Sequence, residues 1–169
     1  MTGVQTCALP ILTQHDCNYL IKKFKAKNIE HLPLFLPTYW SEKNTLNKTE
    51  NYVLYNGDLS VQVNINSVVW LLENVVKELP QIDFIVTGRN PNKNLINKIK
   101  SLKNVELIAN PSNEKINTLI ANAQINLLHS SSNAGIKLKL LNALFNGKQC
   151  VANFETIAGS DLEKIGRAH

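Results

Sequence analysis

Apolar positions switch between two spacings along the chain from residue 52 onward. In one pattern they form short continuous runs, which we interpret as β-strands over residues 52–55, 83–87, 105–109, 125–128 and 149–154. In the other they recur every three to four positions, as on one face of an α-helix, over residues 65–79, 95–102, 116–120 and 136–145. The pattern therefore predicts strands that alternate with helices.

Residues typical of helix ends lie beside these helical stretches. Asn64 suits the N-cap of the first helix, and Pro80 ends it. Ser112 or Asn113 suits the N-cap of the third helix. Asn146-Gly147 predicts a left-handed cap at the end of the fourth.

Strands separated by helices need crossover connections, which place the strands parallel and run right-handed. We therefore predict an α/β fold, a Rossmann-like open parallel sheet with helices on both faces. In such sheets ligands bind beyond the carboxyl ends of the strands, near the point where the strand order reverses. This favours the segments after Tyr55, Thr87, Ala109 and Leu128 as a binding site.

The two ends of the chain differ from its middle. Back-translated, residues 2–11 and 165–169 encode one DNA word in opposite orientations, and that word resembles a library adapter. We therefore expect 1–11 and 165–169 to be artefacts and to lie outside the fold. Residues 12–51 read as a helix (19–25), a short strand (32–37) and a polar linker, which we interpret as the tail of a preceding domain. Residues 52–164 are then the Rossmann-like domain, truncated at its carboxyl end.

Composition narrows the function classes. The formal net charge is +5, but the lysines fall on expected helix surfaces, so we predict no nucleic-acid partner. Cys17 and Cys150 are too isolated for a disulfide framework, and no metal-ligand spacing stands out. No stretch reaches the roughly 20 apolar residues that span a bilayer. The first strand is not followed by G-x-G-x-x-G, which argues against a dinucleotide oxidoreductase.

The loop over residues 130–135 and the helix after it are candidates for anion binding. The loop is small, polar and ends in Gly135, and unpaired backbone N–H groups at a helix start suit a phosphate. Lys137 lies nearest the loop, and Lys139 and Asn142 share one side of the helix. We expect the opposite side to be buried, with Ile136, Leu138, Leu141, Leu144 and Phe145. The alternative is a loop that only caps the helix, with solvated lysines.

Two further side chains near the expected site have structural interpretations. His129 ends the fourth strand, and we interpret it as a hydrogen-bonded structural histidine. Trp70 lies off the main apolar stripe of the first helix, so we expect it to pack on a neighbouring helix or on the preceding domain and not on a base.

Several segments resemble one enzyme family. Residues 135–144 and 147–153 resemble the donor-site helix and the next strand of group-one (family-four-like) glycosyltransferases of bacteria. Residues 52–60 and 84–88 resemble the first two strands of the same domain. The resemblance implies the GT-B fold, with two facing Rossmann-like domains, and identifies this chain with the carboxyl-terminal, donor-binding one.

The resemblance also implies donor-binding residues. Gly57 would begin the loop that the diphosphate approaches, and backbone near Ile108 to Asn110 would face the base. Gly135 and Ile136 would offer N–H groups to the phosphates or the sugar, and Lys139 matches a lysine common on this helix. The remaining candidates near these positions are Asp58, Arg89, Lys137 and Asn142.

The chain departs from the family pattern at important positions. Where the family commonly has two glutamates on the donor-site helix region, this sequence has Ala134 and Asn142. Many members carry an arginine and a lysine after the first strand, whereas Asp58 follows Gly57 here. Arg89 and the lysines of the fourth helix are the candidates to replace that charge. Catalytic residues are therefore left unassigned.

The resemblance predicts a hexosyltransferase-type enzyme that moves a sugar from a nucleotide sugar to a glycan or lipid-linked acceptor. It implies retention of anomeric configuration and no cofactor or obligatory metal. The expected location is cytoplasmic, with peripheral contact at the inner membrane. Ala134 and Asn142 keep one alternative open, a non-catalytic nucleotide-binding or glycosyltransferase-like interaction module. A structural domain that binds no nucleotide is the third class.

Overall fold

The computed structural model describes residues 14–27, 29–30, 49–132, 137–158, 160 and 162. Within them the sheet has five strands in the order β3-β2-β1-β4-β5, and every neighbouring pair is parallel. The strands are β1 (Glu50–Asn56), β2 (Asp83–Gly88), β3 (Val105–Ala109), β4 (Ala123–Leu128) and β5 (Cys150–Ala152). The predicted α/β parallel sheet is therefore confirmed.

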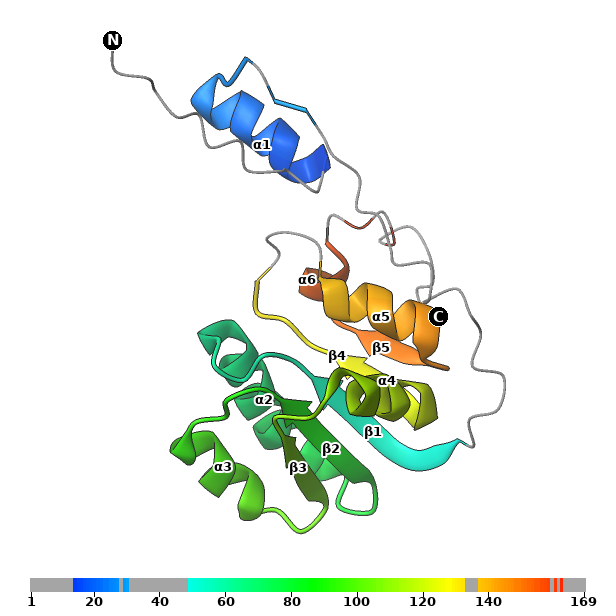
Figure 1. The fold of residues 1–169 in the computed structure, drawn as a ribbon. Helices are drawn as coiled ribbons and strands as arrows, with labels where there is room; N and C mark the ends of the chain where they lie inside the picture. The colour runs from blue at the N-terminus through cyan, green and yellow to red at the C-terminus, as the bar shows by residue number, and fades with distance from the viewer. Residues whose placement is uncertain are drawn as a thin grey trace.

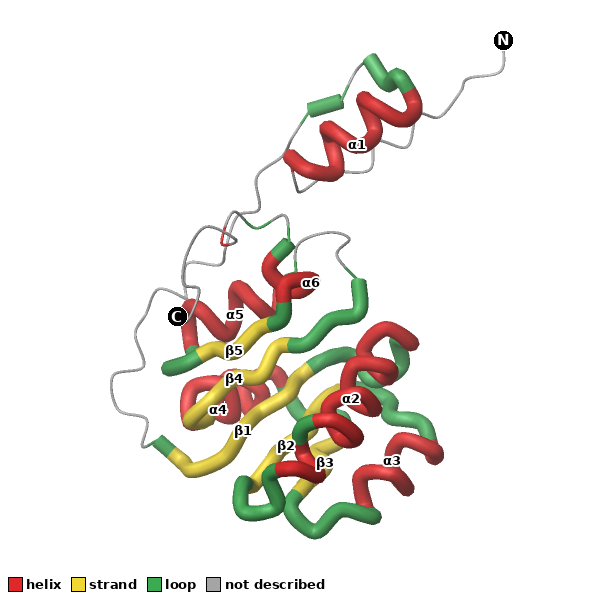
Figure 2. The backbone as a smooth tube through the Cα atoms, turned by 180° about the vertical axis from the view of Figure 1, so that it is seen from behind, coloured by secondary structure: helices red, strands yellow, loops and turns green. Residues whose placement is uncertain are grey.

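Helices cover both faces of this sheet. They are α2 (Gln62–Asn74), the 3-10 turn η2 (Val76–Glu78), α3 (Lys93–Lys100), α4 (Asn113–Asn122), α5 (Leu138–Asn146) and α6 (Phe154–Ile157). In Figure 1, α4 lies in front of β1 and β4, and Figure 2, seen from behind, brings α2 in front of the sheet. Helix α1 (Gln14–Phe24) precedes the sheet and starts earlier than predicted. The strand expected over residues 32–37 lies outside the described residues, and the predicted boundary at residue 52 stays a prediction.

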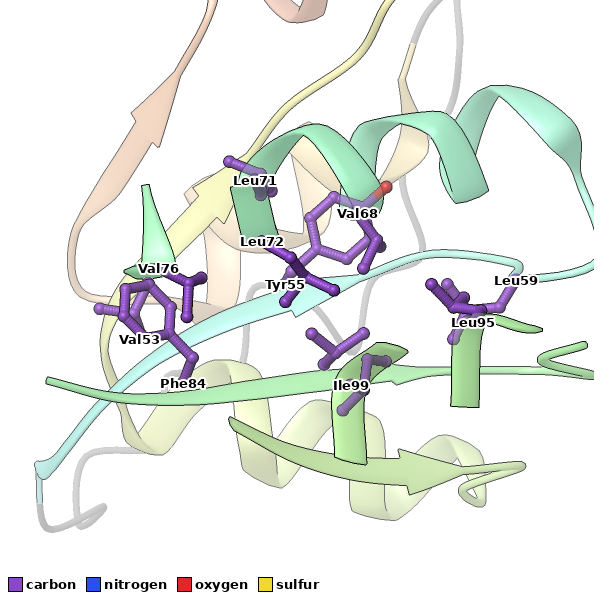
Figure 3. Close-up of a cluster of buried hydrophobic side chains, with 11 residues drawn as sticks. Val53, Tyr55, Leu59, Val68, Leu71, Leu72, Val76, Phe84, Leu95 and Ile99 are labelled. Atoms are coloured by element: carbon purple, nitrogen blue, oxygen red, sulfur yellow. The ribbon is translucent and has the colours of Figure 1, made fainter. Parts of the chain in front are cut away.

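The centre of the core is β1, whose residues 52–55 are all buried. Side chains alternate across a strand, so a strand with helices on both faces reads as a continuous apolar run. On one face Val53 and Tyr55 pack with Val68 and Leu72 of α2, as Figure 3 shows. On the other face, neighbouring β1 residues pack against α4.

Two of the predicted helix ends are wrong. Val61 is the N-cap of α2, and Asn64 lies inside the helix, where its side chain donates to the carbonyl of Asp58 at 3.0 Å. Gly147 has φ −86°, so it is not a left-handed cap. Position 147 has no room for a side chain, because a Cβ there would lie 2.5 Å from the Ala143 carbonyl oxygen. Ser112 does cap α4, accepting from the Lys115 amide at 3.2 Å.

The predicted buried side of α5 is also wrong. Leu138, Leu144 and Phe145 are 58%, 46% and 52% exposed, whereas Leu140 and Ala143 are buried. Apolar residues occur on more than one side of this helix, so spacing alone does not choose the buried side. The small Ala143 side chain is fully buried and faces the core with Leu140. Lys139 lies one helical turn before Ala143, so this orientation of the helix turns Lys139 toward the strand ends.

Candidate functional site

A pocket of about 450 Å³ lies at the carboxyl ends of β1 and β2. The strand order reverses between β1 and β4, and this reversal is where ligands bind in open α/β sheets. The sheet contributes residues 56–58 and 87–89 to the wall, and the helical side contributes Pro111, Asn113, Ile116, Leu138, Lys139 and Asn142. Residues that follow Tyr55, Thr87 and Ala109 therefore meet at one pocket as predicted. The described residues 129–132, which follow Leu128, do not line it, and residues 129–131 line a different hollow.

The floor of this pocket is built by a close approach of two glycines. The Gly57 amide donates to the Thr87 carbonyl at 3.1 Å, and the Leu59 amide donates to the Arg89 carbonyl at 2.9 Å. A Cβ on Gly88 would lie 1.8 Å from the Gly57 carbonyl oxygen, so this residue must be glycine. The amide of Gly57 is already used within the fold, so Gly57 contributes space and not an N–H donor.

An ion pair crosses from β1 to β2 at the pocket wall. The Asp58 carboxylate accepts from the amide and hydroxyl of Ser60, at 3.0 and 2.6 Å, and from the Arg89 guanidinium at 2.9 Å. The hydrogen bonds from Ser60, followed by the nearby guanidinium, lower the pKa of Asp58. The side chain of Arg89 is 70% exposed, so much of its hydrogen-bonding capacity faces solvent and the pocket.

Lys139 reaches the pocket from the first turn of α5. Its Nζ donates to the His129 carbonyl at 2.9 Å and to the Tyr55 hydroxyl at 3.4 Å. It also lies 4.8 Å from the centroid of the Tyr55 ring. Burial, with the nearby charge of Lys137, lowers the pKa of Lys139 to about 8.

The structure brings together five of the predicted donor-binding residues, namely Gly57, Asp58, Arg89, Lys139 and Asn142. Their roles stay predictions, since no ligand is present to test them. The Asn142 side-chain oxygen accepts from the Asn146 side-chain amide at 2.7 Å, and Asn142 lines the pocket.

The other predicted residues are placed differently. Asn110 has φ +52°, and its side chain accepts from the Asn90 amide at 2.8 Å; it stabilises the neighbouring loop and does not line the pocket. Lys137 precedes α5 and is likewise outside the lining. Gly135 and Ile136 lie outside the described residues, as does Ala134.

Sequence reasoning missed Tyr55 as a site residue, because an aromatic residue at the end of a buried strand reads as core. Its side chain is 3% exposed, and only the fold shows that its ring meets Lys139. Residues at the start of α4, Pro111 and Asn113, were also missed, although the turn signal after the third strand pointed to the right edge of the sheet.

A second hollow, of about 750 Å³, lies beyond β4 and β5 beside α2. Trp70 stacks on His129 there, with ring centroids 4.5 Å apart. The expected partner was a neighbouring helix or the preceding domain, whereas the observed partner lies in the segment directly after β4. The prediction of a hydrogen-bonded His129 is wrong for Nδ1, which is buried without a partner. Glu155 is the charged residue of this lining, so the hollow suits an anion less well than the pocket at β1.

The described residues contain no group of three or more His, Cys, Asp or Glu that could hold a metal ion. Within the same residues, no helix combines the length and the apolar character needed to cross a membrane.

Solved structures share this fold. The S. aureus protein TarM, a mutant of which was crystallised with fondaparinux, alpha-GlcNAc-glycerol and UDP, superposes with a TM-score of 0.71 at 19% identity, over 90% of this chain and 31% of that one. The pneumococcal O-GlcNAc transferase GtfA, in complex with UDP and GlcNAc, gives 0.57 at 17%, over 85% and 29%. AviGT4, a glycosyltransferase of avilamycin A biosynthesis, gives 0.62 at 13%, over 85% and 45%.

These neighbours are GT-B glycosyltransferases, and the chain spans less than half the length of each. A comparison with curated proteins finds no match. The family model described as glycosyl transferases group 1 matches residues 50–163, which take in the whole sheet from β1 to β5 and the pocket at its carboxyl edge. On this match, and with the fold in agreement, the chain belongs to the group 1 glycosyltransferases.

Proposed function

We propose that the pocket at the ends of β1 and β2 binds the diphosphate of a nucleotide-sugar donor. One observation carries this proposal: Arg89 from the end of β2 and Lys139 from α5 both line this pocket, although they are far apart in sequence. Cations held at fixed positions are what a leaving diphosphate needs, because negative charge grows on it in the transition state.

The remaining lining fits the other parts of such a donor. Asn142 offers a neutral amide that can hydrogen-bond a ribose hydroxyl. Pro111 and Ile116 supply apolar surface beside Asn113 at the β3 side, which suits a planar base. UDP is bound in the structures of both TarM and GtfA, so uridine nucleotides are the first to test.

We extend the proposal to the complete protein. The sugar is transferred to a glycan or lipid-linked acceptor held by a second domain, in the cytoplasm and in peripheral contact with the inner membrane, without a nucleic-acid partner. Arg89 and Lys139 supply the positive charge that a divalent ion would otherwise provide at a diphosphate, so we propose that donor binding has no obligatory metal and uses no cofactor.

Calorimetric titration of the chain with UDP, GDP and their sugars tests the binding step. Lys139→Met and Arg89→Ala should each weaken nucleotide binding by at least about tenfold, the effect of losing a hydrogen bond to a charged group. The matched control is Lys100→Ala, which removes one exposed lysine from α3, away from the pocket lining. Failure of every nucleotide to bind would reject the proposal.

A non-catalytic nucleotide-binding module is the second candidate, and one observation favours it. Asn142 lies in the pocket where the family commonly has a glutamate, so the described lining offers Asp58 as its acidic group, and that carboxylate is paired with Arg89. Assay of the full-length gene product separates the two candidates, since a binding module would retain the nucleotide affinity and transfer no sugar from any donor that it binds.

A further inference from the structure

We propose that Tyr55 is a positioning residue of the donor pocket, which holds the Lys139 ammonium with its ring face and hydroxyl so that the charge points at the diphosphate. This inference rests on the proposed function and adds to it a residue that never lines the pocket itself. Tyr55 acts through Lys139 and makes no contact of its own with the donor.

Contacts from two strands fix the lysine. Tyr55 comes from the central strand β1, and His129 follows the neighbouring strand β4. The Lys139 Nζ lies 4.8 Å from the ring centroid of Tyr55, donates to its hydroxyl at 3.4 Å and donates to the His129 carbonyl at 2.9 Å. A free lysine side chain samples many rotamers, so these contacts remove freedom that a ligand would otherwise have to remove on binding.

Tyr55 is itself held rigidly. Its side chain is 3% exposed, and Figure 3 shows its ring between β1 and α2, near Val68 and Leu72. The hydroxyl is within reach of the backbone carbonyl and the side-chain oxygen of Asn64, at 3.4 and 3.5 Å. The phenol can therefore donate toward Asn64 while it accepts from Lys139.

The same network continues to the other cation of the pocket. Asn64 donates to the Asp58 carbonyl at 3.0 Å, and the Asp58 carboxylate pairs with Arg89 at 2.9 Å. Tyr55 and Asn64 thus connect the lysine on α5 with the arginine after β2 through the β1–α2 loop. Hydrogen bonds and an ion pair therefore connect the two cations in the ligand-free chain.

The groups nearest the ammonium carry no negative charge. They are an aromatic ring, a hydroxyl and a carbonyl, and burial raises the pKa of the Tyr55 phenol, so it stays protonated. The other titratable groups near Lys139 are Lys137 before α5 and the His129 imidazole after β4, and Asp58 and Arg89 line the same pocket. A ring face is then a principal stabiliser of the ammonium, and its loss should favour the neutral amine.

Two variants test the contact in the ligand-free chain. The pKa of Lys139 is followed by NMR of its ε-carbon, assigned with Lys139→Met, and UDP affinity is measured over pH 6.5–9. Tyr55→Phe retains the ring and loses only the hydroxyl that lies 3.4 Å from the ammonium, so its Lys139 pKa and UDP affinity should fall between those of the wild type and Tyr55→Met. Tyr55→Met should lower the Lys139 pKa and weaken UDP binding at pH 7 by roughly three- to thirtyfold, the range expected for a partly desolvated cation–π contact.

A second series avoids any change in packing. Phenylalanine at position 55 and its mono- and difluorinated analogues have nearly the same shape but progressively weaker negative ring faces. The Lys139 pKa should fall steadily along this series. A Lys139 pKa that is equal across the fluorinated series, or that is unchanged or raised in Tyr55→Met, overturns the proposal. A Lys139 pKa that moves as expected in a chain that binds no nucleotide rejects the proposed function and leaves the contact itself intact.

Discussion

The guanidinium of Arg89 lies 2.9 Å from the carboxylate of Asp58, so the charge that β2 brings to the pocket is already partly balanced by one from β1. Asp58 follows Gly57 in the loop where the resemblance places a cationic residue in many family members. The pocket therefore has an arginine that arrives from the next strand and an acid that holds it in place. A diphosphate would compete with Asp58 for this guanidinium.

Asp58→Asn should therefore tighten nucleotide binding. The amide retains an oxygen for the Ser60 bonds but removes the negative charge, and we expect UDP affinity to rise by roughly two- to fivefold, as befits an exposed ion pair. The gain should shrink with added salt because exposed charges are screened. Calorimetry at two ionic strengths measures it, with Asp83→Asn at the far end of β2 as the matched control. Weaker binding by Asp58→Asn at low salt would show that the carboxylate serves the donor directly.

Gly57 and Gly88 approach each other under the pocket, and a substitution to alanine should destabilise the chain at Gly88 much more than at Gly57. Gly88→Ala forces a methyl group to within 1.8 Å of the Gly57 carbonyl oxygen, a backbone atom that cannot move aside. We expect the free energy of unfolding to fall by about 2 kcal/mol or more, as for overpacked sites. Urea denaturation measures this change.

Gly57→Ala is the control for that substitution. Its nearest contacts are side-chain atoms of Asn64 and Tyr55 at 3.3 and 3.4 Å, which can shift slightly. The free energy of unfolding should change by less than about 1 kcal/mol. Equal losses in the two variants would contradict the close approach of the two loops.

Much of the fold could be predicted because strand and helix spacings were distinct. The continuous apolar run of β1 is compatible only with a buried strand, and the apolar stripe of α2 only with a helix. The parallel arrangement of the strands follows from the crossover connections. The face of α5 could not be predicted, since Leu138, Leu141, Leu144 and Phe145 surround it with apolar groups. Spacing gave no reason to prefer the side that contains the small Ala143.

The sequence indicated which strand ends form the site, but it did not indicate which side chains contact one another there. Arg89 and Asp58 follow different strands, so their ion pair depends on how β1 and β2 are paired, which sequence spacing does not reveal. Tyr55 shows the same limit, because its partner Lys139 is 84 positions away along the chain. Asn110 shows this limit locally: its φ is positive and its side chain accepts from the Asn90 amide, a contact that sequence spacing does not reveal.

Nucleotide binding should be insensitive to metal removal. Arg89 and Lys139 line the pocket and are the cations that we propose for the diphosphate, so EDTA should leave the UDP affinity within about twofold. Removal of a bound divalent ion would instead cost several kcal/mol of binding free energy. The matched measurement adds Mg²⁺ or Mn²⁺ to Lys139→Met, where a metal would have most reason to bind. A loss of wild-type binding in EDTA that Mg²⁺ restores would contradict the metal-free site.

The stability of the fold should depend on pH through Lys139. Its pKa is about 8 in the folded chain, against 10.5 for an ordinary lysine, so between these values the unfolded chain binds more protons than the folded one. Stability therefore rises as pH increases through this window, and the cost of holding the buried ammonium is fully present below pH 8. Between pH 7.5 and 9.5 the free energy of unfolding of the wild type should rise by about 2 kcal/mol more than that of Lys139→Met, because one additional proton is lost from the folded wild-type chain over this range. Urea titrations of the two proteins at matched pH measure the difference, and parallel pH profiles would show that Lys139 is solvated in the folded chain.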